Sequence, residues 1–104
     1  MEISTTVKIA SLKDSNYYSW ATEMRSLLIL KEAWSPIADD VEYSLLEDDD
    51  KVKLELKALS LIILHISIPL RPLIAGHIMG SAAWRALKNH FAARTVSRWR
   101  IRQA

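Results

Sequence analysis

The sequence has no cysteine, only 2 glycines and only 3 prolines among its 104 residues. Without cysteine the chain has no disulfide, no thiolate nucleophile and no zinc site built on thiolates. Glycine and proline are too few for the many turns that a multi-stranded β protein of this length needs. The composition therefore predicts a single all-α globular domain over residues 1–104.

Long apolar runs and targeting signals are also missing. The longest apolar run, residues 61–70, is interrupted by polar residues and a proline, and it is shorter than the roughly 18 residues that a membrane span requires. The start Met1-Glu2 lacks the basic and apolar pattern of a secretory signal. These features predict an intracellular, cytoplasmic protein that has no membrane partner.

Acidic residues are absent from the last third of the chain. Residues 1–70 carry 7 Lys and Arg against 12 Asp and Glu, a net charge of −5, whereas residues 71–104 carry 7 basic residues and no acid, a net charge of +7. Such a two-ended charge distribution suits a partner with a phosphate backbone, and it equally suits head-to-tail contact between copies of the chain.

Apolar residues at helical spacing predict a compact bundle of four to five helices. Residues 1–13 are expected to form an N-terminal arm, and Asp14-Ser15-Asn16 to cap the first helix. That helix is expected to end near Pro36. Residues 39–50 hold seven acids and are expected to form a solvated loop, whose last three aspartates favour the start of the next helix.

The second helix is expected from about Lys51 to Ile66, and because it becomes apolar nearly all round, it is predicted to lie in the middle of the bundle. Ser67 is a candidate cap for a short third helix. A fourth helix is expected over residues 81–93, and a fifth from Thr95 on, truncated where the chain ends.

The predicted core consists of the large apolar residues on these helical stripes. It contains Tyr17, Trp20, Met24, Leu27, Leu28, Trp34, Leu59, Ile63, Trp84, Leu87, Phe91 and Trp99. Three of the four tryptophans fall on the apolar stripe of their own helix, which favours packing over a ligand cage.

No residue constellation for catalysis is visible. His65, His77 and His90 lack metal-ligand spacing, and the acidic stretch lacks the glycine of a calcium loop. The chain has neither a glycine-rich phosphate loop nor a Gly-x-Ser-x-Gly elbow. We therefore predict no catalytic residue, no metal, no cofactor and no small-molecule substrate, and we expect that the protein is not an enzyme.

The C-terminal segment is the one stretch that resembles a nucleic-acid contact, because it combines several arginines with an aromatic ring. It contains Arg94, Arg98, Arg100 and Arg102, with Trp99 between them. The same residues could instead contact an acidic surface on another subunit, and the sequence leaves both alternatives open.

Three pieces of the sequence together resemble a known family. They are Asn16-Tyr17-x-x-Trp20, then Ala33-Trp34-x-x-Ile37, then Ala82-x-Trp84-x-x-Leu87-x-x-x-Phe91, separated by an acidic spacer and an aliphatic helix. In order and spacing, over about residues 11–102, the chain resembles the amino-terminal part of the Gag polyprotein of copia-type LTR retrotransposons. Phe91 stands where the family usually has Tyr, and Ala33 where Leu is common.

The resemblance implies a helical domain similar to the N-terminal domain of retroviral capsids, which helps Gag to assemble into an RNA-packaging particle. The family's second capsid domain and zinc knuckle have no counterpart in this sequence, so the resemblance implies either a fragment of Gag or a shortened, domesticated descendant. It transfers fold residues and no catalytic residue.

Two functions remain as expectations. The first is a structural self-association module, a homo-oligomer whose isolated domain is expected to be either a monomer or a dimer when dilute. The alternative is a small helical protein that binds nucleic acid, RNA in particular, through Arg94, Arg98, Arg100 and Arg102.

Overall fold

The computed structural model describes the backbone of residues 9–103 and the side chains of residues 9–93. This part of the chain folds into six helical segments and contains one isolated β-bridge but no strand, so the predicted all-α class is confirmed. In chain order the segments are α1 (Tyr17–Leu30), α2 (Ser35–Ala38), α3 (Val41–Ser44), α4 (Asp48–Leu64), the 3₁₀ helix η1 (Ile68–Leu73) and α5 (Gly80–Gln103).

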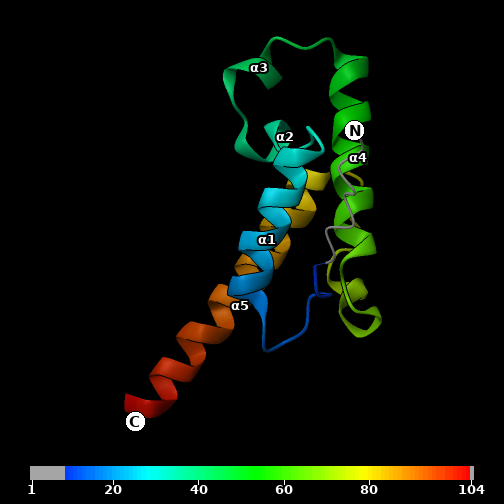
Figure 1. The fold of residues 1–104 in the computed structure, drawn as a ribbon. Helices are drawn as coiled ribbons and strands as arrows, with labels where there is room; N and C mark the ends of the chain where they lie inside the picture. The colour runs from blue at the N-terminus through cyan, green and yellow to red at the C-terminus, as the bar shows by residue number, and fades with distance from the viewer. Residues whose placement is uncertain (1–8, 104) are drawn as a thin grey trace.

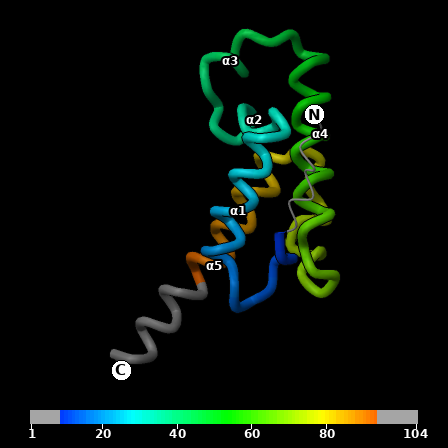
Figure 2. The backbone as a smooth tube through the Cα atoms, viewed as in Figure 1, coloured from blue at the N-terminus to red at the C-terminus, as the bar shows by residue number. Residues whose placement is uncertain are grey.

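The three long helices α1, α4 and α5 form the body of the domain, as Figures 1 and 2 show. The short helices α2 and α3 lie together at the end of the body where α1 ends and α4 begins. α1 runs toward this end, and α4 and α5 run away from it. The core lies between the three long helices. Its buried apolar residues are Leu12, Tyr17, Trp20, Met24, Leu27, Leu28, Ala33, Ala58, Leu59, Ile62, Ile66, Ile74, Ala83, Leu87 and Phe91.

α1 begins at Tyr17 and Asn16 occupies its N-cap position, but the predicted side-chain cap does not form. The Asn16 side chain makes no capping hydrogen bond to the helix. Its Oδ1 accepts from the backbone N–H of Lys13 at 2.7 Å, and its Nδ2 donates to the carbonyl of Ser11 at 3.0 Å. Asn16 therefore shapes the turn that leads into α1, because its short amide bonds the preceding backbone instead of the following one.

The segment before α1 contributes to the core. Leu12 is fully buried and forms a parallel bridge with Ile66, just after α4. Its N–H donates to the carbonyl of His65 at 2.8 Å, and the same carbonyl accepts from Trp20 Nε1, also at 2.8 Å. One carbonyl thus joins the N-terminal segment, α1 and the end of α4.

The acidic stretch 39–50 is more helical than the predicted loop. Asp39 has a φ of 51° and ends α2. Asp40 caps α3, since its Oδ1 accepts from the N–H of Tyr43 at 2.9 Å. α4 begins at Asp48, so three aspartates fill its first turn. The prediction that the last three aspartates favour the start of the next helix is confirmed, and Asp40 lies at a helix N-terminus as well, where a carboxylate offsets the exposed N–H groups.

The central position predicted for the second helix is wrong. α4 lies at one side of the body (Figure 1), with one face against the other long helices. On its outer face Val52 is 57% exposed, Leu56 47% and Leu64 69%. A domain with three long helices has too few elements to enclose one of them, whatever its hydropathy.

The end of the chain also differs from its prediction. The short helix predicted after Ser67 is present as η1, but the Ser67 side chain makes no capping hydrogen bond to it. The expected fourth and fifth helices are one continuous helix, α5, of 24 residues. No glycine or proline occurs between residues 81 and 103 to interrupt it. None of the helices in the described part of the chain combines the length and hydropathy that crossing a bilayer demands.

Candidate functional site

An aromatic cluster joins α1, α5 and the start of α2. The rings of Tyr17 and Phe91 are stacked with centroids 4.7 Å apart, and those of Trp20 and Trp84 are stacked at 5.8 Å. Trp34 meets Trp84 edge-to-face at 5.3 Å. Each such pair contributes about 0.5–1.5 kcal/mol beyond the burial of its surface. The cluster therefore links α5 to α1 through two stacked ring pairs.

The residues predicted for the core differ in their burial. Tyr17, Trp20, Met24, Leu27, Leu28, Leu59, Leu87 and Phe91 are buried, whereas Trp34, Ile63 and Trp84 are half-buried and pack against the core. The side chain of Trp99 lies outside the described residues. Buried positions that the helical stripes did not predict include Leu12, Ile66 and Ile74.

The arginines predicted for nucleic-acid or subunit contact, Arg94, Arg98, Arg100 and Arg102, all fall within α5. Their side chains lie outside the described residues. Their order along a helix nevertheless sets their register, since residues 94 and 98, and residues 98 and 102, are four positions apart and share a face.

The three histidines have different surroundings. His65 Nδ1 lies 2.7 Å from the carbonyl of Leu61, a backbone contact within its own helix. His90 meets Phe91 edge-to-face, and His77 is exposed. Among the described residues, no group of three or more acidic, histidine or cysteine side chains could hold a metal ion.

Glu55 on α4 is the one buried acidic or basic residue in the described part of the chain, with 5% of its surface exposed. Its Oε1 accepts from the backbone N–H of Ser81 at 2.9 Å. Its Oε2 accepts from the Ser81 hydroxyl at 2.9 Å and from the Tyr43 hydroxyl at 3.0 Å. Glu55 thus caps the N-terminus of α5 from another helix and ties α3 to the same point.

Gly80 allows this approach. A Cβ at residue 80 would lie 2.5 Å from the Cβ of Ala58 and 2.8 Å from the backbone nitrogen of Leu59. These distances are far inside van der Waals contact, and one of the two atoms belongs to the backbone of α4. A glycine at this position therefore lets the start of α5 lie directly on α4.

Two tyrosines have raised pKa values. Burial raises the pKa of Tyr17 above its usual 10.0, with a smaller contribution from Tyr18. Burial also raises the pKa of Tyr43, and the hydrogen bond to Glu55 and the negative charge of that residue add to the effect. A protonated phenol is what Glu55 requires, because only the O–H form can donate to the carboxylate.

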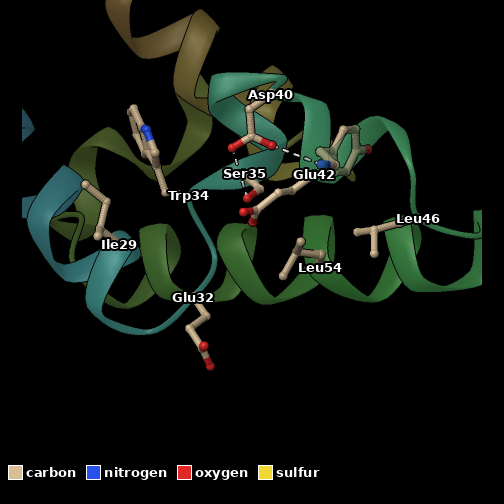
Figure 3. Close-up of a pocket in the computed structure, with 9 residues that line it drawn as sticks. Ile29, Glu32, Trp34, Ser35, Asp40, Glu42, Leu46 and Leu54 are labelled. Carbon is tan, nitrogen blue, oxygen red and sulfur yellow. Dashed lines mark hydrogen bonds between the residues drawn. The ribbon is translucent and has the colours of Figure 1, made fainter.

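A cavity of about 420 Å³ lies beside this cluster, between α2, α3 and the start of α4 (Figure 3). Its apolar lining comes from Ile29, Trp34, Leu46 and Leu54, and its polar lining from Glu32, Ser35, Asp40, Glu42 and Tyr43. Figure 3 shows the carboxylates of Asp40 and Glu42 near Ser35, whereas the side chain of Glu32 extends away from them.

The cavity combines negatively charged side chains with aromatic and aliphatic surface, and the Nζ of Lys51 lies 5.5 Å from the centroid of its Tyr43 ring. Glu32, Asp40 and Glu42 are exposed, and no basic residue is part of the lining. The guanidinium of Arg25 lies 5.4 Å from the centroid of the Trp34 ring, so this indole already takes part in a cation–π contact. The arrangement suits a cationic group on an aliphatic stem, such as an arginine or lysine side chain, better than an anion.

The sequence did not predict either the Glu55 cluster or the cavity. Each is made of residues from several elements that are unremarkable in their own helix, such as a single glutamate or a half-buried tyrosine. The only signal was the acidic composition of residues 39–50, which indicated a charged surface without indicating a hollow.

The described part of the molecule thus defines an all-α domain with a buried apolar core and an acidic cavity. Comparison of the chain with protein-family models, with curated proteins and with solved structures gives no match in any of the three.

Proposed function

We propose that this domain is a structural self-association module, related to the capsid-like N-terminal region of copia-type Gag. The observation that carries the proposal is the aromatic cluster. Tyr17 and Trp20 belong to the first motif of the resemblance, Trp34 to the second, and Trp84 and Phe91 to the third. Rings from all three motifs meet in one contact network.

This convergence supports the proposal because it gives the motif spacing a physical reason. If the chain and the family share one packing of helices, the residues that make the contacts between helices should keep the same spacing in both sequences. Motif residues with unrelated positions on the surface would have weakened the resemblance. The capsid-like arrangement of the helices is part of the same proposal.

Exposed apolar side chains and separated charge on the surface are suited to contacts between copies. Apolar side chains remain exposed on the outer face of α4, at Val52, Leu56 and Leu64. Opposite charge is separated between the acidic end of the body and the basic C-terminal segment. Particle lattices form from many weak contacts of this kind, so the isolated domain is expected to associate only as its concentration rises.

Light scattering over a wide range of protein concentration, without nucleic acid, tests the proposal. We expect the weight-average mass to rise with concentration at low salt. A mass that stays that of a monomer at every concentration would refute it.

The alternative function, RNA binding through the C-terminal arginines, is supported by the net charge of +7 over residues 71–104. An RNA titration at two salt concentrations separates the two functions. If all four arginines met phosphates of a single strand, the logarithm of the binding constant would fall with the logarithm of salt at a slope of about −2.8. Tight binding with that slope by a protein that remains monomeric would favour the alternative.

A further inference from the structure

The acidic cavity and the basic C-terminal segment lie at opposite ends of one helix. The N–H of Ser81, at the start of α5, is held by Glu55, which also binds the hydroxyl of Tyr43 in the cavity lining. α5 therefore begins beside the cavity. From residue 81 to residue 98 a helix extends about 26 Å.

Because α5 is continuous, a chain cannot bring its own basic segment to its own cavity. An intramolecular contact would require the helix to fold back on itself, and no glycine or proline within residues 81–103 provides a hinge. Any contact between these two surfaces has to join two copies of the chain.

The two surfaces match in chemistry. The segment 94–102 contains four arginines and no acid, and the polar lining of the cavity contains three carboxylates and no base. Guanidinium groups bind carboxylates through two parallel hydrogen bonds and also stack on aromatic rings. Leu46 and Leu54 supply apolar surface for the aliphatic stem, and the lining also contains the rings of Trp34 and Tyr43, which already have Arg25 and Lys51 of the same chain beside them.

We propose that the cavity receives arginine side chains from the α5 segment 94–102 of a second copy, so that the domains associate head to tail. This inference rests on the proposed function, since it assigns the surfaces through which self-association occurs. A heterologous contact of this kind leaves one free cavity and one free basic segment on every dimer, and it therefore produces chains or closed rings.

A charge-exchange experiment on the full chain tests the assignment. The cavity variant carries Glu32→Lys and Glu42→Lys, which leave Asp40, the cap of α3, in place. The segment variant carries Arg98→Glu and Arg102→Glu, a pair on one helix face. The control variant, Glu23→Lys with Asp49→Lys, makes the same change of charge at two exposed residues outside the cavity lining. Circular dichroism establishes that each variant is folded.

We expect each of the first two variants to weaken association at least about tenfold, because like charges then face each other across the contact, while the control variant associates as the unaltered chain does. An equimolar mixture of the cavity and segment variants should associate again, because the unaltered arginines of one variant meet the unaltered cavity of the other, and the reversed charges on the remaining two surfaces also match. A chain that carries both exchanges should associate again, because its charges are reversed together.

Other outcomes overturn the inference in distinguishable ways. If the unaltered chain associates and both variants do so equally well, the surfaces are wrong while self-association stands. If the segment variant loses only RNA binding, the arginines contact nucleic acid instead of the cavity. If the unaltered chain is monomeric at every concentration and at low salt, the proposed function and this inference both fail.

Discussion

Replacement of Glu55 by alanine is the perturbation with the most specific structural consequence. The carboxylate is buried and accepts three hydrogen bonds, one from the N–H of Ser81 and one each from the hydroxyls of Ser81 and Tyr43. A hydrogen bond to a charged group contributes about 1.5–3 kcal/mol. The three values do not add, because the two hydroxyls belong to half-buried residues and can turn to water in the variant.

The N–H of Ser81 cannot turn away, because it belongs to the first turn of α5. Loss of a helix cap costs about 0.5–2 kcal/mol, and a stranded buried donor costs about 1–3 kcal/mol. We therefore expect Glu55→Ala to lower the free energy of unfolding by roughly 3 kcal/mol, which corresponds to a fall in Tm of roughly 10–25 °C.

Urea unfolding followed by circular dichroism measures this change. Glu55→Gln is the informative companion variant, since an amide can still accept from Ser81 and donate to the two hydroxyls, but has no charge to stabilise the helix N-terminus. It should lose about 1–2 kcal/mol. Glu23→Ala, an exposed glutamate on α1, is the matched control and should change stability by less than about 0.5 kcal/mol. If Glu55→Ala were no more damaging than Glu23→Ala, the capping argument would be refuted.

Three further predictions follow from the packing. Gly80→Ala should destabilise the domain by at least about 1–3 kcal/mol in the same urea assay, because its Cβ would collide with Ala58 and the backbone of α4, and a change below that range would show that the helices separate easily. Trp20→Ala should lower the free energy of unfolding by about 3–5 kcal/mol, since it removes a buried ring and the donor to the His65 carbonyl. Trp34→Ala should lower it by less, because Trp34 is only half-buried, and equal losses in the two variants would contradict this difference in burial. The raised pKa values of Tyr17 and Tyr43 mean that the folded chain holds these protons more tightly than the unfolded chain, so stability should be unaffected below pH 10.0 by these groups and should fall as the pH rises above it. Urea unfolding at neutral and alkaline pH measures this loss of stability, and the loss should be smaller in Tyr43→Phe.

Periodicity was sufficient to predict the helices whose buried residues follow one stripe. In α1, Tyr17, Trp20 and Met24 recur at helical spacing, and the helix begins where this pattern begins. The fold class and the approximate positions of the helices follow from such local information. The capping role of Asn16 was wrong because the same side chain can bond backbone on either side of it, and sequence alone does not choose between them.

The features that failed or were missed depend on tertiary contacts. α4 is apolar on two faces, and hydropathy does not tell which of them the neighbouring helices cover. Leu12 follows no periodic stripe, so its burial against Ile66 gave no signal. Within its own helix Glu55 has the sequence context of an ordinary surface glutamate. Its burial is favourable because Ser81 and Tyr43, which are distant in the sequence, donate hydrogen bonds to its carboxylate.

The shared carbonyl of His65 has a consequence for the order in which the chain acquires its structure. Trp20 reaches it across 45 residues of sequence, and the second donor, Leu12, comes from still farther away. Helices such as α1 form from neighbours within microseconds, whereas a contact between such distant partners has to wait for a large loop to close. We therefore expect the contacts at the His65 carbonyl to form after the local turns of α1, and a chain that begins after Leu12 would keep only one of the two donors to this carbonyl.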